Sequence, residues 1–309
     1  MDKKEIIFDS SAGGGRRVKG FIYQAPESQI TLQICHGMAE HMGRYEQMIE
    51  YLNGMGITVC AIDMLGHGET SKLNKDPLGY FGDIPNAYES IFEDNLIFAT
   101  RVSEITGQSP SVLFGHSMGS FVVRCMYSRE RYATKYKAFV FCSTKGPEPL
   151  ASFGLVLSKF LCAIGQDKKP GKLIDKLAFG AYNSHIPNPR TDSDWLTTDE
   201  KEIDKYIADP LSGFMFTNGG FKAMLSLVKE QQSKSAIESF CGKPCLMPYG
   251  EEDPVTGWGK GVVKVINQLK SKGIEVTARN FGPYRHELMN EPVREEFFKF
   301  VGDFVLKFV

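Results

Sequence analysis

The sequence predicts an α/β fold in which a mostly parallel, doubly wound sheet carries an inserted helical cap. Short β-branched apolar segments alternate with helical segments along most of the 309 residues, as in doubly wound sheets. One region, from about 148 to 235, shows helical patterns but no convincing strand, and it is too long to be a loop. The core is therefore expected at 1–147 and 236–309, with the cap at 148–235.

The N-terminal third predicts a hairpin followed by a strand–helix–strand unit. Strands are expected at 4–8 and 16–23, because the Gly-rich turn SSAGGG lies between them. The segments 30–35 (ITLQIC) and 57–62 (ITVCAI) are β-branched and apolar, as expected of buried strands. Residues 44–55 between them have apolar side chains at helical spacing. This order implies a right-handed crossover and a parallel sheet.

The rest of the predicted core repeats this alternation of strands and helices. Strands are expected at 112–114, 138–142, 244–249 and 274–281, and helices at 85–106, 118–129, 261–270 and 291–308. Pro85 would lie in the first turn of its helix, where a missing N–H is tolerated.

Composition and charge exclude several function classes. Hydrophobic residues make up 42% and charged residues 24%, an ordinary globular balance. The formal net charge is −1 and no basic stripe stands out, so nucleic acid is not an expected partner. The start lacks the apolar stretch of a signal peptide, and the longest apolar region, 150–164, carries Lys159 and is too short to cross a bilayer. We therefore expect a soluble, cytoplasmic protein.

The seven cysteines are typical of buried thiols in a reducing compartment, since their number is odd and most lie in apolar runs. Cys241 and Cys245 are too few for a zinc site. Neither a metal nor an organic cofactor is expected.

Residues 115–119 read GHSMG, which is the pattern G-x-S-x-G with Ser117 at its centre. The pattern alone is weak, but an apolar strand (VLF) runs into it and a helical stretch follows. That setting is typical of a nucleophile elbow, in which glycines prevent collisions between the sharp turn and the neighbouring strand and helix. The alternative is a surface turn with a serine helix cap.

A histidine base must be able to reach this serine. In strand–turn–helix sites of this kind the chain order is serine, acid, histidine, and only His185 and His286 follow Ser117. His185 lies in the predicted cap. His286 lies between the last predicted strand and the final helix, where a loop can bring it over the elbow, so it is the predicted base.

The acid is expected on the loop after the strand 244–249, which reads GEEDP. Asp253 is favoured because it is set farther into the loop and the following proline restricts its backbone to an extended form. Glu252 is the alternative, and a solvated acidic turn would suit Glu251. The acid would accept a hydrogen bond from the histidine Nδ1–H and stabilise the imidazolium.

The oxyanion hole is expected to take one donor from the loop after the strand 30–35 and one from the residue after the nucleophile. We therefore predict the backbone N–H groups of Met38 and Met118. His36 is interpreted as hydrogen-bonded within this loop, and His41 and Arg44 as shaping the loop and the helix start. None of them is interpreted as a metal ligand.

Five segments, taken together and in order, resemble the monoacylglycerol lipase and lysophospholipase group of the α/β-hydrolase fold family, often labelled serine aminopeptidase-like. They are HGMAEHMGRY, DMLGHGETS, GHSMGS, the GEEDP loop and RHELMNE. The resemblance spans about 30 to 300 apart from the cap, which is the least matched part.

This resemblance implies a catalytic triad of Ser117, Asp253 and His286 and an oxyanion hole at Met38 and Met118. It supports Asp253 over the neighbouring glutamate, because the family's acid stands three residues after the loop glycine. It also implies an α/β-hydrolase fold with a mobile cap over an acyl-chain tunnel.

The cap offers the available indications of the substrate. Its apolar residues suit an acyl chain, and Phe153, Leu157, Phe214 and Phe216 are the candidate substrate-binding residues. The alternative is that these side chains only pack the cap onto the core. A peripheral membrane contact through the first cap helix is a further hypothesis, although the polar face of this helix is not markedly basic.

The chain is therefore predicted to be a serine hydrolase that cleaves carboxylic esters through an acyl-enzyme on Ser117. Monoacylglycerols or lysophospholipid-type acyl esters are the expected small-molecule substrates. An aminopeptidase or amidase on the same fold stays open, because acidic residues between 192 and 204 could bind a substrate amine. A non-catalytic binding protein on a hydrolase scaffold is an alternative of another class, but it need not retain serine, acid, histidine and both oxyanion loops.

Overall fold

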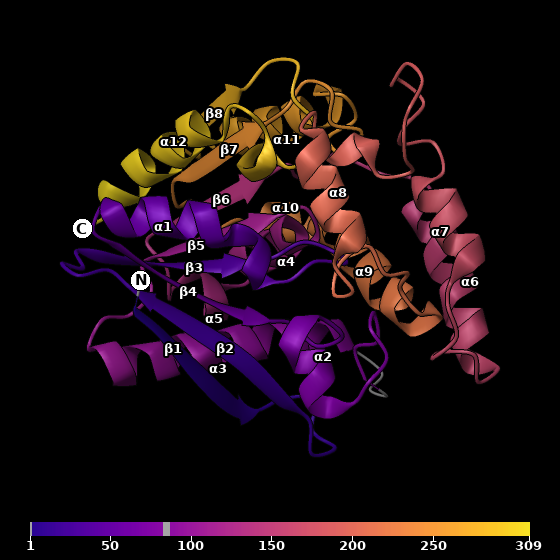
Figure 1. Ribbon diagram of the computed structural model, residues 1–309, viewed down its shortest axis with the longest axis horizontal. Coiled ribbons are helices and arrows are strands. Elements are labelled where there is room, and N and C mark those ends of the chain that lie inside the picture. Colours follow the sequence, from indigo (N-terminus) through magenta and orange to yellow (C-terminus); the bar gives the residue numbers. More distant parts are fainter. Residues whose placement is uncertain (1, 83–86) are drawn as a thin grey trace.

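The computed structural model describes residues 2–82 and 87–309, and within them one sheet of eight strands forms the centre of the molecule (Figure 1). Its order is β1-β2-β4-β3-β5-β6-β7-β8. The strands are β1 Asp2–Asp9, β2 Arg17–Gln24, β3 Ile30–Cys35, β4 Ile57–Asp63, β5 Val112–His116, β6 Ala138–Cys142, β7 Cys245–Tyr249 and β8 Val276–Asn280. β1 and β2, and β2 and β4, are antiparallel, whereas the pairs from β4 to β8 are parallel. The predicted mostly parallel α/β sheet is confirmed.

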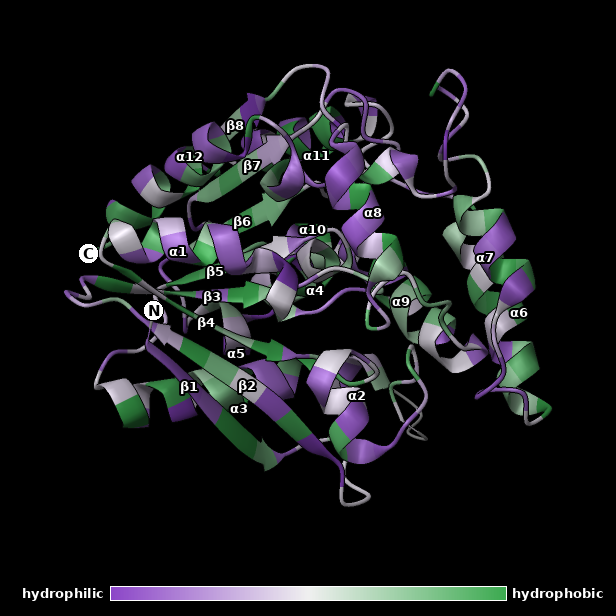
Figure 2. Cartoon of the chain, in the orientation of Figure 1, coloured by the Kyte–Doolittle hydropathy of each residue, from purple (hydrophilic) through white to green (hydrophobic). Residues whose placement is uncertain are grey.

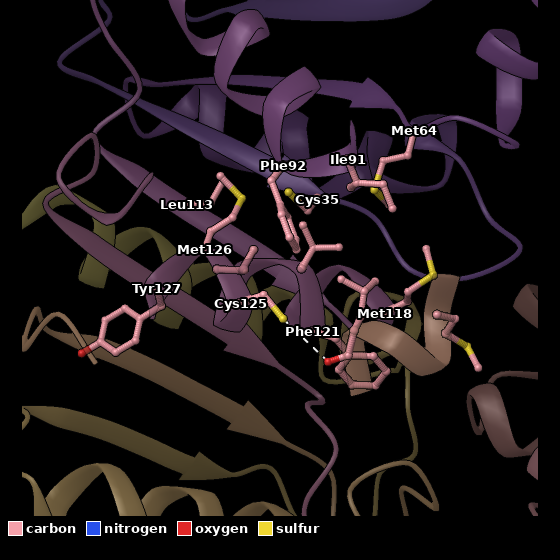
Figure 3. Close-up of a cluster of buried hydrophobic side chains, with 14 of the residues drawn as sticks. Cys35, Met64, Ile91, Phe92, Leu113, Met118, Phe121, Cys125, Met126 and Tyr127 are labelled. Atoms are coloured by element: carbon pink, nitrogen blue, oxygen red, sulfur yellow. Dashed lines mark hydrogen bonds between the residues drawn. The ribbon is translucent and has the colours of Figure 1, made fainter. Parts of the chain in front are cut away.

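Helices cover both faces of the sheet, as the doubly wound prediction requires. The core helices are α1 Glu46–Gly54, α2 Gly68–Asn74, α3 Ala87–Thr106, α4 Met118–Tyr127, α5 Glu130–Ala133, α11 Lys260–Ser271 and α12 Arg294–Leu306, with short 3-10 turns η1 Met42–Tyr45 and η3 Leu288–Asn290. One buried cluster lies between the sheet and α1 and α12. The other joins the sheet to α3, α4 and α11. Figure 3 shows part of this second cluster, including Cys35, Phe92, Leu113, Phe121 and Cys125.

Side chains that alternate between the two faces of each strand explain how one sheet contributes to both buried clusters. On β5, Val112 and Phe114 belong to the cluster under α1 and α12, whereas Leu113 belongs to the other. Successive side chains of a strand point to opposite faces, so a strand buried on both faces is apolar throughout. Figure 2 accordingly colours the central strands as largely hydrophobic.

Between β6 and β7 the chain forms a series of helices, and no strand occurs there among the described residues. They are α6 Ala151–Ala163, α7 Lys172–Phe179, the 3-10 turn η2 Asp194–Leu196, α8 Glu200–Ala208, α9 Asn218–Gln231 and α10 Lys234–Glu238. α9 packs against both α4 and α6. In Figure 1 the carboxyl ends of the central parallel strands point toward α8 and α9, with α6 and α7 farther out.

Some predicted boundaries differ from the observed ones. The predicted helix 44–55 is a 3-10 turn followed by α1 from Glu46, and the final helix begins at Arg294, after Pro292. α2 was not predicted, because its first residue, Gly68, belongs to a segment that was interpreted as a Gly-rich turn. The predicted helix start at Pro85 lies outside the described residues.

Two further observations concern the helices and the thiols. Among the described residues, no helix combines the length and apolar character needed to span a bilayer. All seven cysteines are free thiols, and five of them are buried.

Candidate active site

Ser117 lies on the turn between β5 and α4, and its backbone is strained. Its φ of 52° and ψ of −121° fall in a region that residues with a side chain rarely adopt, at a cost of about 1–3 kcal/mol. The turn is held in place because the Ser117 N–H donates to the Cys142 carbonyl oxygen at 3.1 Å. The predicted strand, turn and helix are therefore present, with the serine at the sharpest point.

The glycines on either side of this turn are required by close backbone contacts. A Cβ on Gly115 would lie 2.3 Å from the carbonyl oxygen of Gly119. A Cβ on Gly119 would lie 2.0 Å from the carbonyl oxygen of Cys35. Any side chain at either position would push β3, β5 and α4 apart, which is the steric reason inferred from the motif.

His286 and Asp253 form a buried pair on neighbouring loops. The His286 Nδ1 lies 3.0 Å from both carboxylate oxygens of Asp253, and the exposed fractions of the two residues are 2% and 0%. A carboxylate only accepts, so Nδ1 carries the hydrogen and the Nε2 lone pair is left for a proton. Glu252, the alternative acid, is exposed on the same loop. His185 is exposed and stacks on Trp258, with ring centroids 4.0 Å apart.

Ser117 and His286 open onto one cavity of about 550 Å³, within the range of small-molecule sites. Three aromatic rings continue its wall away from His286 toward α7. Ring centroids are 5.1 Å apart between His286 and Trp195, 4.9 Å between Trp195 and Tyr182, and 5.2 Å between Tyr182 and Phe179. These three aromatic residues were not predicted from the sequence, because they lie in the predicted cap and carry no motif.

The two predicted oxyanion donors, Met38 and Met118, also line this cavity. The amides flanking the first donor are engaged, since the Gly37 N–H donates to Glu40 and the Ala39 N–H donates to the His67 Nε2 at 3.4 Å. Among the described residues, no partner accepts the Met38 N–H. Met118 is the first residue of α4, and the first N–H groups of a helix have no partner within it. Both amides are therefore free to bind an anion.

The substrate-binding candidates in the predicted cap divide into two pairs. Phe153 and Phe214 line the cavity. Leu157 and Phe216 do not, although both lie within the described chain. Phe216 is fully buried against His67 and other rings, and Leu157 packs against the core. The role of these two residues in substrate binding stays a prediction, because apolar helical spacing does not distinguish a cavity wall from an interior contact.

Three polar residues of the loop that follows β3 make hydrogen bonds that support its shape. His36 lies 2.8 Å from the Gly37 carbonyl oxygen and also accepts the Met64 N–H at 3.0 Å, so it reaches beyond its own loop. His41 caps η1 by accepting the Gly43 N–H, and Arg44 binds Glu287. The described residues contain no group of three or more His, Cys, Asp or Glu side chains placed to bind a metal.

Comparison with known proteins places this geometry in a family. Residues 26–293 match the family model described as serine aminopeptidase, S33. The chain is 27% identical to a monoacylglycerol lipase of Mycolicibacterium smegmatis, covering 92% of this chain and 90% of that protein. It is 25% identical to phospholipase YtpA of Bacillus subtilis, covering 93% and 99%. A thermostable carboxyl esterase of Bacillus coagulans, solved with glycerol, superposes with a TM-score of 0.92 at 27% identity, covering 100% and 99%.

Proposed function

The chain belongs to the serine aminopeptidase S33 family of α/β-hydrolases, and from this premise we propose that it is a serine hydrolase that cleaves carboxylic esters. The proposed triad is Ser117, Asp253 and His286. One observation carries the proposal: a strained serine and a buried histidine–carboxylate pair open onto the same largely apolar cavity.

The proposed reaction is a two-step acyl transfer. The Ser117 hydroxyl attacks the ester carbonyl carbon while its proton passes to the His286 Nε2. The oxyanion accepts hydrogen bonds from the Met38 and Met118 N–H groups, and the N-terminus of α4 favours the negative charge. The C–O bond then breaks, and the leaving alcohol takes the proton from His286. Water attacks the acyl-enzyme with the histidine again as base, which releases the acid and restores the serine.

The proposed substrates are monoacylglycerols or lysophospholipid-type acyl esters. The names of the relatives point to acyl esters of lipids. The cavity wall that includes Phe153, Phe214 and Trp195 supports an acyl chain, because burying each methylene group contributes about 0.8 kcal/mol.

The helices between β6 and β7 are proposed to act as a cap, with limits at 148 and 235. They contribute much of the cavity wall, and α6 and α7 carry exposed apolar side chains, with Leu173 and Leu177 on α7. Val156 and Phe160 are 66% and 60% exposed, which supports the hypothesis of a peripheral membrane contact. Co-sedimentation with phosphatidylcholine vesicles should fall for V156S/F160S and stay unchanged for I105S, a control at an apolar residue of α3 that is 46% exposed. Equal sedimentation of all three proteins would contradict the contact.

One observation keeps an aminopeptidase or amidase as the second candidate. Asp192, one of the predicted cap carboxylates, lines the cavity together with Asp175. Either carboxylate could bind a substrate amine. Other predicted carboxylates are engaged elsewhere, since Asp194 accepts the Arg190 and Thr191 N–H groups and Asp199 caps α8.

A parallel assay separates the two candidates. Wild type, Ser117→Ala and Ser128→Ala would be compared on p-nitrophenyl esters of increasing chain length, monoacylglycerols, a lysophosphatidylcholine and aminoacyl p-nitroanilides. Ser128 lies at the far end of α4, where its hydroxyl donates to the Cys125 carbonyl oxygen, so this variant should keep full activity. We expect ester hydrolysis that Ser117→Ala loses by about 10⁴-fold or more. Faster cleavage of anilides than of esters would favour the aminopeptidase, and cleavage of neither would contradict both.

A further inference from the structure

Glu40 is a buried carboxylate between the oxyanion loop and the nucleophile elbow. It is 2% exposed. One of its oxygens accepts the Gly37 N–H, the Tyr45 hydroxyl at 2.8 Å and a nitrogen of His116 at 3.2 Å. The other accepts from Arg44 at 3.2 Å. Four groups from two segments thus converge on one side chain.

His116, the residue before the nucleophile, has only acceptors around its ring nitrogens. Nδ1 faces the Glu40 carboxylate, and Nε2 lies 3.2 Å from the carbonyl oxygen of His286. Neither group can donate a hydrogen bond, so both ring nitrogens must carry hydrogen for both contacts to form. His116 is therefore an imidazolium in this arrangement, and its ring centroid lies 4.7 Å from that of His286.

The electrostatics of the pair agree with this assignment. Burial, the largest influence, lowers the pKa of His116, but the hydrogen bond and charge of Glu40 outweigh it and raise the pKa. Burial raises the pKa of Glu40, but His116 and Arg44 together hold it well below its usual value. Both partners are therefore charged.

Arg44 extends the network to the residue after His286. It donates to the two carboxylate oxygens of Glu287 at 2.5 and 2.7 Å, and its guanidinium lies 4.6 Å from the centroid of the Tyr206 ring. The Glu287 N–H donates to the Leu196 carbonyl oxygen at 2.7 Å, which ties this loop to the helices between β6 and β7. Glu40 and Glu287 balance His116 and Arg44, so loss of one charge would leave another buried and uncompensated.

We propose that Glu40 is a positioning residue that fixes the oxyanion loop and the His286 loop relative to Ser117. It acts through two branches. His116 holds the His286 backbone, and Arg44 holds Glu287. The proposal rests on the proposed function, because it assigns Glu40 to the geometry of that reaction. Distortion of about 1 Å in such a site lowers the rate about 10²-fold.

The test compares Glu40→Gln with Asp94→Asn. Gln keeps the size of the side chain but removes its charge. Asp94 is a matched control, because it is 1% exposed and binds Ser10 and Ser11 far from the site, each at 2.7 Å. On a p-nitrophenyl ester, Glu40→Gln should lower kcat about 10- to 100-fold and change KM by no more than about twofold. Glu40→Asp, which keeps the charge, should have a kcat between those of Glu40→Gln and wild type. Asp94→Asn should lower thermal stability and leave kcat unchanged.

Labelling of Ser117 by a fluorophosphonate separates failure of this inference from failure of the proposed function. Wild type that neither labels nor cleaves esters overturns the proposed function and the inference with it. Active wild type with equal kcat for Glu40→Gln and Asp94→Asn overturns the inference alone. If Glu40→Gln does not fold, ¹⁵N-histidine NMR of wild type decides, with the His116 signals assigned from His116→Gln. Two protonated ring nitrogens at pH 7, above the ordinary pKa of about 6.5, support the network, and a neutral ring overturns it.

Discussion

The core and the helices between β6 and β7 meet at one cavity but contribute to it in different ways. The core side chains and amides proposed for chemistry follow the carboxyl ends of strands, with Met38 after β3, Ser117 after β5, Asp253 after β7 and His286 after β8. The inserted helices contribute mainly apolar and aromatic side chains to the wall. Parallel strands end at one edge of a sheet, so backbone geometry fixes the chemical groups, while helix packing shapes the space for the substrate. Substitutions in the two regions should therefore have separable effects.

The largest effect is expected for the acid on the core side. Asp253→Asn should lower kcat about 10⁴-fold, because the amide cannot stabilise the imidazolium or hold its tautomer. Glu252→Gln, one residue earlier on the same loop, is the matched control and should keep wild-type activity. Steady-state kinetics on a p-nitrophenyl ester measure both. Comparable losses of kcat in the two variants would contradict the assignment of Asp253 as the catalytic acid and of Glu252 as part of a solvated turn.

Two phenylalanines that precede α9 sharpen the comparison within the inserted region. Phe216→Ala should lower the free energy of unfolding by about 3–5 kcal/mol, because the ring is fully buried. Phe214→Ala should cost much less stability and instead shift the preferred acyl-chain length, because this ring lines the cavity. Denaturant unfolding and a chain-length series measure the two properties. A chain-length shift in Phe216→Ala alone would contradict the assignment of the wall.

Substitution of one glycine in each region tests how well the local backbone tolerates an added Cβ. Gly119→Ala should cost about 3 kcal/mol of stability or more, because the new Cβ would lie 2.0 Å from a backbone oxygen of β3. Gly154→Ala on α6 should cost less than about 1 kcal/mol, because the nearest atom is the end of the flexible Leu225 side chain at 3.0 Å. Denaturant midpoints of both variants provide the measurement. Equal costs would mean that the elbow is less constrained than its geometry indicates.

The smallest effect concerns the buried pair of His116 and Glu40. The pKa of His116 is raised in the folded protein. Its charge therefore stabilises the folded state fully at a pH below the pKa of about 6.5 in the unfolded chain. This stabilisation is lost as the pH rises through the pKa of the folded state. The stability difference between wild type and His116→Gln should therefore shrink as the pH rises above about 6.5, by at most about 1.4 kcal/mol per pH unit. Three titratable groups face this ring: Glu40 at its Nδ1, His286 with its ring centroid 4.7 Å away, and Tyr45 with its ring centroid 6.5 Å away. A difference that is independent of pH would contradict the charged ring.

The sequence predicted the fold and the chemical groups better than the cavity. Chain order and loop position favoured His286 over His185 and Asp253 over Glu252, because strand ends in a parallel sheet lie at a common edge, and in the structure His286 contacts Asp253. The contacts of Glu40 with His116 and of Arg44 with Glu287 could not be predicted, since they join residues 76 and 243 positions apart without a pattern that pairs them. Phe214 and Phe216 are both aromatic, and only the packing of β- and α-layers decides which one lines the cavity.

The most direct test of the central claim is covalent labelling of the native protein by a fluorophosphonate, followed by intact mass and peptide mapping. The account predicts one adduct, on Ser117, that forms quickly in wild type and in Glu252→Gln. The adduct should form far more slowly in His286→Gln, because the base that activates the hydroxyl is gone. An adduct on another residue, or equal labelling of Ser117 in wild type and His286→Gln, would contradict a serine activated by His286.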